Sequence, residues 1–269
     1  MAGETDLSPL STLKARLMAG LFAVAFYNTI EIFFLIFTTF QRWNGRYFWS
    51  MMAAATGIPA HTIAFLLRYY GVASSVSMGA FSILGWCFMV TGQSIVLWSR
   101  LHLVVDDPLK IRLVLLMIIV NVLALHIPET VIFVLLQTDP ETYLHTFIVY
   151  ERVEIVLFSM QESIISGLFL WEGYHSFQAV IVLKGATGRR IVVQLVALFL
   201  VNVLLDSVLV TLEYTNNFDL ETACKPLIYS IKLKVEFIIL NRLLVFIRQT
   251  PALAVRVVAT NSVAHAQPV

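Results

Sequence analysis

The chain has 269 residues, of which 59% are hydrophobic and only 13% are charged. An average soluble domain carries roughly 25% charged residues, so a water-soluble protein could not cover this composition with polar surface. The lipid bilayer is therefore the expected partner of most of the chain. The net charge of +1 argues against a nucleic-acid partner, which would require a basic face.

The first segment, residues 1–16, does not have the pattern of a cleavable signal peptide. Its acidic residues precede Lys14 and Arg16 and a long apolar run follows, whereas a signal peptide starts basic and has a shorter apolar core. Ser8 and Pro9 are typical of an N-cap and a first helical residue. We expect an N-terminal extramembrane segment over residues 1–16, in which the first helix already begins.

Seven apolar runs of 20 to 26 residues follow, and a hydrocarbon core requires roughly 20. They are continuous rather than alternating, which indicates helices and not β-barrel strands. The sequence thus predicts an all-α, polytopic bundle of seven transmembrane helices over residues 17–247, with a flexible tail over residues 248–269. The runs are Leu17–Phe40, Phe48–Leu67, Ala73–Trp98, Ile111–Leu136, Phe147–Trp171, Ile191–Leu212 and Leu227–Ile247.

The connections between these runs are mostly short and leave no room for a soluble domain. The longest, residues 172–190, contains three glycines and is predicted to be a loop. No internal repeat marks an inverted-repeat transporter.

Lysine and arginine residues predict the orientation of the bundle. One side collects ten of them. The other collects only four, outside the membrane, with a fifth, Arg152, just inside a helix end; the four are Lys14, Arg16, Arg68 and Lys225. Because cytosolic loops carry the excess of basic residues, we expect the N-terminus outside or in the lumen and the C-terminus in the cytosol, in the plasma membrane or the endoplasmic reticulum. The basic side contains Arg42, Arg46, Arg100, Lys110, Arg112, Lys184, Arg189, Arg190, Arg248 and Arg256.

Several ionisable side chains fall inside the predicted spans, where each costs on the order of 2.5–3.5 kcal/mol. Five carboxylates and two lysines leave an excess of three negative charges. Either some carboxyls are protonated, or arginines such as Arg68 and Arg152 and the histidines contribute, or a cation enters. The seven residues are Glu31, Glu129, Glu162, Asp206, Lys232, Lys234 and Glu236.

Helical spacing places the polar residues in stripes, and these should face the bundle interior because lipid cannot solvate them. His126 and Glu129 are three residues apart, whereas Lys232 and Glu236 are four apart and could neutralise each other. Polar contacts between helices also commonly stabilise helix packing in membrane proteins, so each pair has a purely structural interpretation as well. The longest stripe lies on the fifth run and contains Glu151, Glu154, Phe158, Gln161, Glu162 and Ser166.

The predicted depth of these residues separates two groups of site candidates. Glu31, Glu162 and Asp206 lie nearer the midplane and are the candidate acids if a reaction is catalysed. No histidine or cysteine spacing indicates a metal site, so neither a metal nor a cofactor is expected. The ligand-binding candidates, assigned to a polar pocket in the outer half, are His126, Glu129, Glu154, Gln161, Lys232, Lys234 and Glu236.

His61 follows Gly57 and Pro59, and we interpret it as part of a proline-relaxed helix rather than as a ligand.

The stretch Met89–Val104, with the sequence MVTGQSIVLWSRLHLV, carries the third run from the membrane interior to its surface. Gln93 and Arg100 continue a stripe begun upstream by Trp86, which should face the bundle axis. Together with His102 they are predicted to form an inner gate or a packing spine rather than the binding site itself.

This stretch resembles an uncharacterised family of fungal multipass membrane proteins, known only as a domain of unknown function. The resemblance continues in the segments QESIISG, which starts at Gln161, and YSIKLKVEF, which starts at Tyr229, and it covers residues 48–242. It implies a seven-helix fungal membrane protein and carries no activity or functional residues with it.

Three functions fit these features. A receptor-like sensor or membrane scaffold is favoured, because seven helices and a polar outer half suit a small-molecule pocket, although no Asp-Arg-Tyr follows the third run. A membrane-embedded enzyme for a lipid-like or terpenoid substrate would need a protonated carboxyl and aromatic faces, as in cyclase-type acid catalysis. A proton- or cation-coupled carrier is favoured by the carboxyl excess and weakened by the lack of repeats.

A retinal-binding lysine at Lys232 or Lys234 is disfavoured. Ile228 and Ser230, four residues earlier, replace the aspartate that microbial opsins place there.

Overall fold

The structure, a computed structural model, describes residues 9–40, 45–70, 72, 75–105, 107–184, 186–215, 220–239 and 241–243. These residues form helices and turns, and no strand occurs among them. A last helical segment, called the C-terminal helix below, covers residues 220–239. The preceding elements are α1 (Pro9–Thr39), α2 (Arg46–Tyr69), α3 (Ser75–Leu101), α4 (Pro108–Asn121), the π-helix η1 (Val122–His126), α5 (Ile127–Thr138), α6 (Pro140–Lys184) and α7 (Ala186–Tyr214).

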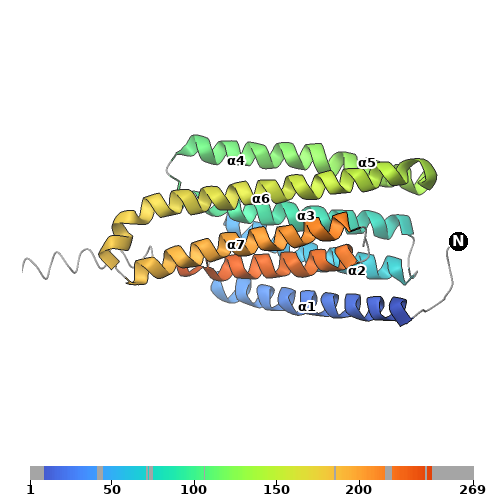
Figure 1. The fold of residues 1–269 in the computed structure, drawn as a ribbon, viewed down its shortest axis with the longest axis horizontal. Helices are drawn as coiled ribbons and strands as arrows, with labels where there is room; N and C mark the ends of the chain where they lie inside the picture. The colour runs from blue at the N-terminus through green and yellow to red at the C-terminus, as the bar shows by residue number, and fades with distance from the viewer. Residues whose placement is uncertain are drawn as a thin grey trace, which may run out of the picture.

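The helices form one elongated bundle in which successive long helices run in opposite directions (Figure 1). Within the described chain, six are long and apolar enough to cross a membrane, with α4, η1 and α5 together making a single span over Pro108–Thr138. The C-terminal helix is a further long helix of the bundle, and it is more highly charged because Lys225, Lys232, Lys234 and Glu236 lie on it. The chain is therefore a multipass helical membrane protein.

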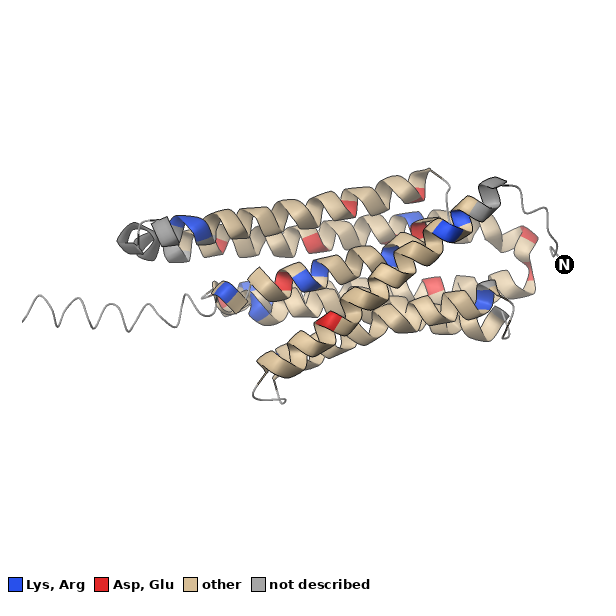
Figure 2. Ribbon diagram, turned by 90° about the horizontal axis from the view of Figure 1, so that it is seen from below, with Lys and Arg blue, Asp and Glu red and all other residues tan. Residues whose placement is uncertain are grey.

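The surface of the bundle has the character expected of a protein in lipid. Large apolar side chains point outward, such as Phe34 on α1 and Leu204 on α7, with exposed fractions of 68% and 63%. Charged residues instead occur along the middle of the helices as well as at their ends (Figure 2). Many of them are buried, because a charge that faces its neighbours in the bundle avoids the hydrocarbon.

The described residues of the predicted apolar runs are helical apart from Phe40, and most of the helices begin before or end after the run they contain. The predicted loop over residues 172–190 was wrong, since α6 continues to Lys184 and α7 begins at Ala186. A helix satisfies its own backbone hydrogen bonds, so it can leave the hydrocarbon region without unwinding, and glycine weakens a helix by only about 1 kcal/mol. The predicted tail, residues 248–269, lies outside the described residues.

Helices α2 and α3 approach each other very closely, and glycines make this possible. A Cβ atom on Gly57 would lie 2.6 Å from the backbone nitrogen of Met89, and one on Gly92 would lie 2.7 Å from the backbone nitrogen of Ala54. A Cβ on Gly85 would collide with the backbone of His61. Small residues allow such approach in membranes, where van der Waals packing holds helices together.

One end of the bundle collects basic residues. Arg46 at the start of α2, Arg100 at the end of α3 and Lys110 at the start of α4 lie at one end, together with Arg189 and Arg190 at the start of α7. The opposite end is formed by the start of α1, the end of α2, the start of α3 and the start of the C-terminal helix (Figure 1).

Candidate functional site

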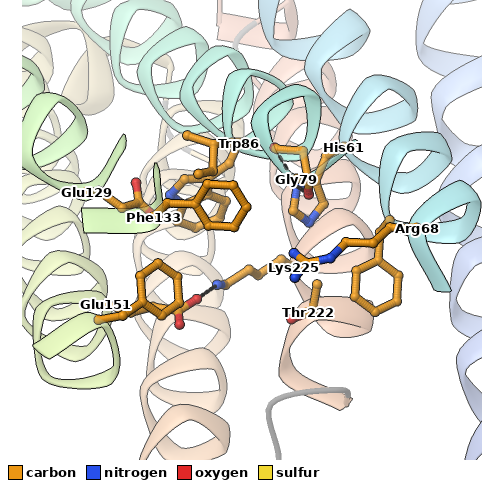
Figure 3. A pocket seen from close by; sticks show the side chains of 13 residues that line it. His61, Arg68, Gly79, Trp86, Glu129, Phe133, Glu151, Thr222 and Lys225 are labelled. Atoms are coloured by element: carbon orange, nitrogen blue, oxygen red, sulfur yellow. Dashed lines mark hydrogen bonds and ion pairs between the residues drawn. The ribbon is translucent and has the colours of Figure 1, made fainter. Parts of the chain in front are cut away.

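A cavity of about 310 Å³ opens at the end of the bundle where α1 begins, and we call it the end cavity (Figure 3). Its wall combines the aromatic rings of Phe65, Trp86, Phe133 and Phe147 with five titratable side chains. The polar set comes from four different helices and consists of His61, Arg68, Glu129, Glu151 and Lys225. Apolar walls with a few convergent polar groups are typical of small-molecule sites.

Lys225 is the central cation of the end cavity. Its Nζ atom lies 2.8 Å from a carboxylate oxygen of Glu151 on α6 and 2.6 Å from one of Glu221, four residues earlier on its own helix. The ammonium also lies 4.7 Å from the centre of the Trp86 ring. Lys225 is buried, so these carboxylates and the aromatic face replace the water that would otherwise solvate its charge.

His61 forms the opposite wall, beside Arg68 at the end of α2 (Figure 3). Its Nδ1 atom lies 2.9 Å from the carbonyl oxygen of Ser82 and 3.0 Å from the hydroxyl of the same residue on α3. From the sequence, we interpret His61 as part of a proline-relaxed helix and not as a ligand. Its ring does contact α3, but it also lines the end cavity.

Next to the end cavity, His126 and Glu129 face Glu154 on α6, and all three are buried. The wide turn of η1 ends at His126, and such π-turns occur often at functional sites. Pro128 has no N–H to donate to the carbonyl of Ala124, and the hydroxyl of Tyr150 donates to that carbonyl instead, at 2.6 Å.

A second polar cluster lies deeper in the bundle, around Lys232. The Lys232 ammonium donates to Glu162 on α6, at 2.7 Å, and to Asp206 on α7. Glu236 accepts a hydrogen bond from Asn202 at 3.1 Å. Lys232 is thus paired across the bundle rather than with Glu236 one turn away.

The structure divides the predicted ligand-binding residues among several places. His126, Glu129 and Glu154 come together beside the end cavity, whereas Lys232 and Glu236 lie in the deeper cluster. The predicted candidate acids do not line the end cavity, because Glu162 and Asp206 hold Lys232, and Glu31 pairs with Lys234 at 2.6 Å.

Gln161 belongs to neither cluster. Its side-chain oxygen accepts a hydrogen bond from Asn121 at 2.7 Å, and its amide donates to Ser94 at 2.9 Å. It therefore ties α6 to α3 and α4.

Two of the three predicted gate residues lie inside the bundle. Gln93 is buried on α3, and the guanidinium of Arg100 is buried 3.6 Å from the centre of the Tyr47 ring on α2. The predicted stripe from Trp86 through Gln93 to Arg100 is confirmed as a buried face of α3. His102 lies after the helix and is exposed, so it does not join this face.

Lys225 and Glu221 were missed by the sequence reasoning, which placed Lys225 among the residues outside the membrane. The chain is already helical at residue 220, before the apolar run starts at Leu227, and both residues lie inside the bundle. Their spacing of four residues was a usable signal, because an acid and a base at that spacing neutralise each other on a helix.

Comparison with known proteins gives one match. Residues 5–256 match the family described as "Domain of unknown function (DUF7703)". No curated protein and no solved structure matches the chain.

Proposed function

The chain belongs to the DUF7703 family, a domain of unknown function, and we propose that it is a receptor-like membrane protein that binds a small amphipathic molecule in the end cavity. The observation that carries this proposal is the joint presence of four aromatic rings and of Arg68, Lys225, Glu129 and Glu151 in one open cavity. We place the end cavity on the outer or lumenal side, because the opposite end carries more basic residues.

The chemistry of the cavity suits a ligand with two distinct parts. Trp86 and Phe133 offer apolar faces, while Arg68 and Lys225 offer donors to an acidic or carbonyl group (Figure 3). A ligand anion would compete with Glu151 for Lys225 and so loosen an ion pair between α6 and the C-terminal helix.

Helix α3 provides a connection from this cavity to the other end of the bundle. Its buried face carries Trp86 at the cavity and Arg100 on Tyr47 at the basic end. A shift of α3 on ligand binding would change the packing of Arg100 against α2. This is the element through which we propose that the receptor-like protein signals.

The test is a thermal-shift screen of small molecules against the purified chain in detergent. A ligand at a concentration 100 times its Kd stabilises the folded protein by about 2.7 kcal/mol, which raises Tm. Gly79→Leu should obstruct the end cavity, because a Cβ atom on Gly79 would overlap the Phe133 ring and displace this part of the cavity wall. Gly20→Leu is the matched control, since a Cβ there meets nothing within 4 Å.

We expect compounds that raise Tm of the wild type and of Gly20→Leu but not that of Gly79→Leu. Compounds that stabilise all three proteins equally would place binding elsewhere and contradict the proposal. Active compounds would then be tested for activation of fungal Gα subunits through the chain. We choose these subunits because we propose that the chain is the seven-helix fungal protein that its resemblance implies. If no subunit responds, we would conclude that the chain is a membrane scaffold.

A proton- or cation-coupled carrier is the second candidate, and the deeper cluster favours it. Lys232, Glu162 and Asp206 form a buried ionic group whose members come from three helices. If liposomes contain such a carrier, an inward proton gradient should acidify the liposome lumen. Lys232→Met should abolish this proton flux. An enzyme of the cyclase type has less support, because the candidate acids are each engaged with a lysine.

A further inference from the structure

Three side chains from two spans converge beside the end cavity. One ligand atom each from His126, Glu129 and Glu154 lies within 4.8 Å of the others. Their exposed fractions are 5%, 4% and 1%, so the group is shielded from solvent. We propose that these three residues bind a divalent transition-metal ion of the Zn²⁺ type, a property that goes beyond ligand binding in the end cavity and does not depend on it.

The spacing of the donor atoms fits a metal. The Nδ1 atom of His126 lies 2.9 Å from Oε1 of Glu154 and 3.8 Å from Oε2 of Glu129. Imidazole and carboxylate ligands bind Zn²⁺ at about 2.0–2.2 Å, which puts tetrahedral ligand atoms about 3.3–3.6 Å apart. The two measured distances lie on either side of this range, so small side-chain movements complete the geometry.

The donor atoms form ion pairs with one another, but two of them make no hydrogen bond. Nδ1 of His126 and Oε2 of Glu129 have no hydrogen-bond partner of suitable geometry among the described residues. A buried polar atom without a partner costs about 1–3 kcal/mol, and more when it is charged. A shared cation would satisfy both atoms at once.

The surroundings of the three residues match those of metal ligands. The second ring nitrogen of His126, Nε2, lies 3.3 Å from the hydroxyl of Thr91, and this hydroxyl can accept from Nε2 in the tautomer whose Nδ1 lone pair binds a metal. The ring stacks on Phe158 with centroids 4.8 Å apart. Trp86 donates a hydrogen bond of 3.2 Å to Oε1 of Glu154. Partners of this kind hold metal ligands in orientation.

The charges at this end of the bundle also call for a cation. Three basic residues, Arg68, Arg152 and Lys225, accompany five buried carboxylates in the described chain. The excess is two negative charges, which one divalent ion would neutralise. Lys225 cannot serve His126 and its partners, because it already bridges two other carboxylates. The five acids are Glu129, Glu151, Glu154, Glu213 and Glu221.

An ion has a route to the three ligands. Glu129 lines the end cavity while its carboxylate belongs to the metal-binding group, so the cavity gives access to the site (Figure 3). The carboxylates suit hard cations and the imidazole suits Zn²⁺, Fe²⁺ or Cu²⁺, which together favour a first-row transition ion over Mg²⁺ or Ca²⁺.

The experiment uses the full chain in detergent, stripped with a chelator and then dialysed against Zn²⁺. We expect one Zn²⁺ per chain by elemental analysis. Loss of a partner that only orients a ligand weakens metal binding 10–100-fold, so Glu129→Gln and Glu154→Gln should each weaken it at least tenfold. Glu213→Gln is the matched control, because Glu213 is a buried carboxylate of the neighbouring acidic group, and it should bind like the wild type.

A spectroscopic readout separates coordination from folding. Zinc-edge X-ray absorption should show one imidazole nitrogen in the wild type and none in His126→Gln, with retained Tm and monodispersity showing that the variant is folded. Absence of stoichiometric Zn²⁺ would overturn the proposal and indicate a protonated His126 paired with Glu154. Zinc binding that is unchanged in both glutamine variants, or lost in Glu213→Gln, would overturn it too.

Discussion

Lys232 has no exposed surface and lies between the carboxylates of Glu162 and Asp206. Removing one member of a buried ion pair costs about 3–5 kcal/mol, because the remaining charge is left without compensation. We therefore expect Lys232→Met to lower the free energy of unfolding by about that amount, measured by chemical denaturation in detergent.

Two comparisons make this prediction specific. Lys110→Met should change the free energy of unfolding little, because the Lys110–Glu172 pair lies at the exposed start of α4. The triple variant Lys232→Met, Glu162→Gln, Asp206→Asn should recover part of the lost stability, since it also removes the two carboxylates that Lys232→Met leaves without their partner. Equal losses for Lys232→Met and Lys110→Met would show that Lys232 has no special structural role.

Tyr150 supports the wide turn that presents His126. Its hydroxyl replaces the N–H that Pro128 lacks, so Tyr150→Phe leaves the carbonyl of Ala124 without this donor. We expect a loss of about 0.5–1.5 kcal/mol in the free energy of unfolding. Tyr27→Phe, at an outward-facing position on α1, should change it little, and a similar loss in both variants would contradict the explanation.

At the scale of elements, helices α2 and α3 make the closest backbone approach that the glycines reveal. Gly92→Val would place a branched side chain against the backbone of Ala54, which cannot move without separating the helices. Overpacking costs about 1–3 kcal/mol, and more where backbone must shift. The prediction is a lowered Tm and a loss of monodisperse protein on size-exclusion chromatography.

Gly20→Ala provides the comparison for Gly92→Val. Gly20 lies in α1 with open space around its missing Cβ, so alanine should be tolerated. If Gly92→Val kept the wild-type Tm, the close approach of α2 and α3 would not be a structural requirement.

Which elements form was predictable, but how long they are was only partly so. Apolar length identifies a membrane span, and it succeeded for α1, α2 and α3. It failed where a helix continues beyond the hydrocarbon, as α6 does up to Lys184, and where buried charges interrupt an apolar run, as in the C-terminal helix. In both cases the backbone remains helical for reasons that hydropathy does not record.

At the scale of the whole molecule, the uneven distribution of basic residues predicts the orientation. We expect the basic end in the cytosol and the end cavity outside or in the lumen. In a background with Cys87→Ser and Cys224→Ser, Glu141→Cys at the start of α6 should react with a membrane-impermeant maleimide on sealed cells. If the chain resides in the endoplasmic reticulum, sealed microsomes prepared without protease are used in place of cells. Their outer face is the cytosolic face, so Glu141→Cys should then be protected from the maleimide.

His102→Cys is the partner variant for this measurement. His102 is exposed at the basic end, so its cysteine should label only from the cytosolic side. Cells that label His102→Cys and not Glu141→Cys would reverse the orientation and place the end cavity in the cytosol.

The sequence by itself determined that this is a multipass helical membrane protein and which faces of its helices are polar. Both properties are local: apolar length marks a span, and the 3.6-residue period puts Glu154, Gln161 and Glu162 on one inward face. Only the tertiary structure decided which charges meet. Lys232 pairs with Glu162 and Asp206, and His126 meets Glu154, because partners on different helices are selected by the depth and rotation of each helix in the bundle. No spacing along the chain encodes that register.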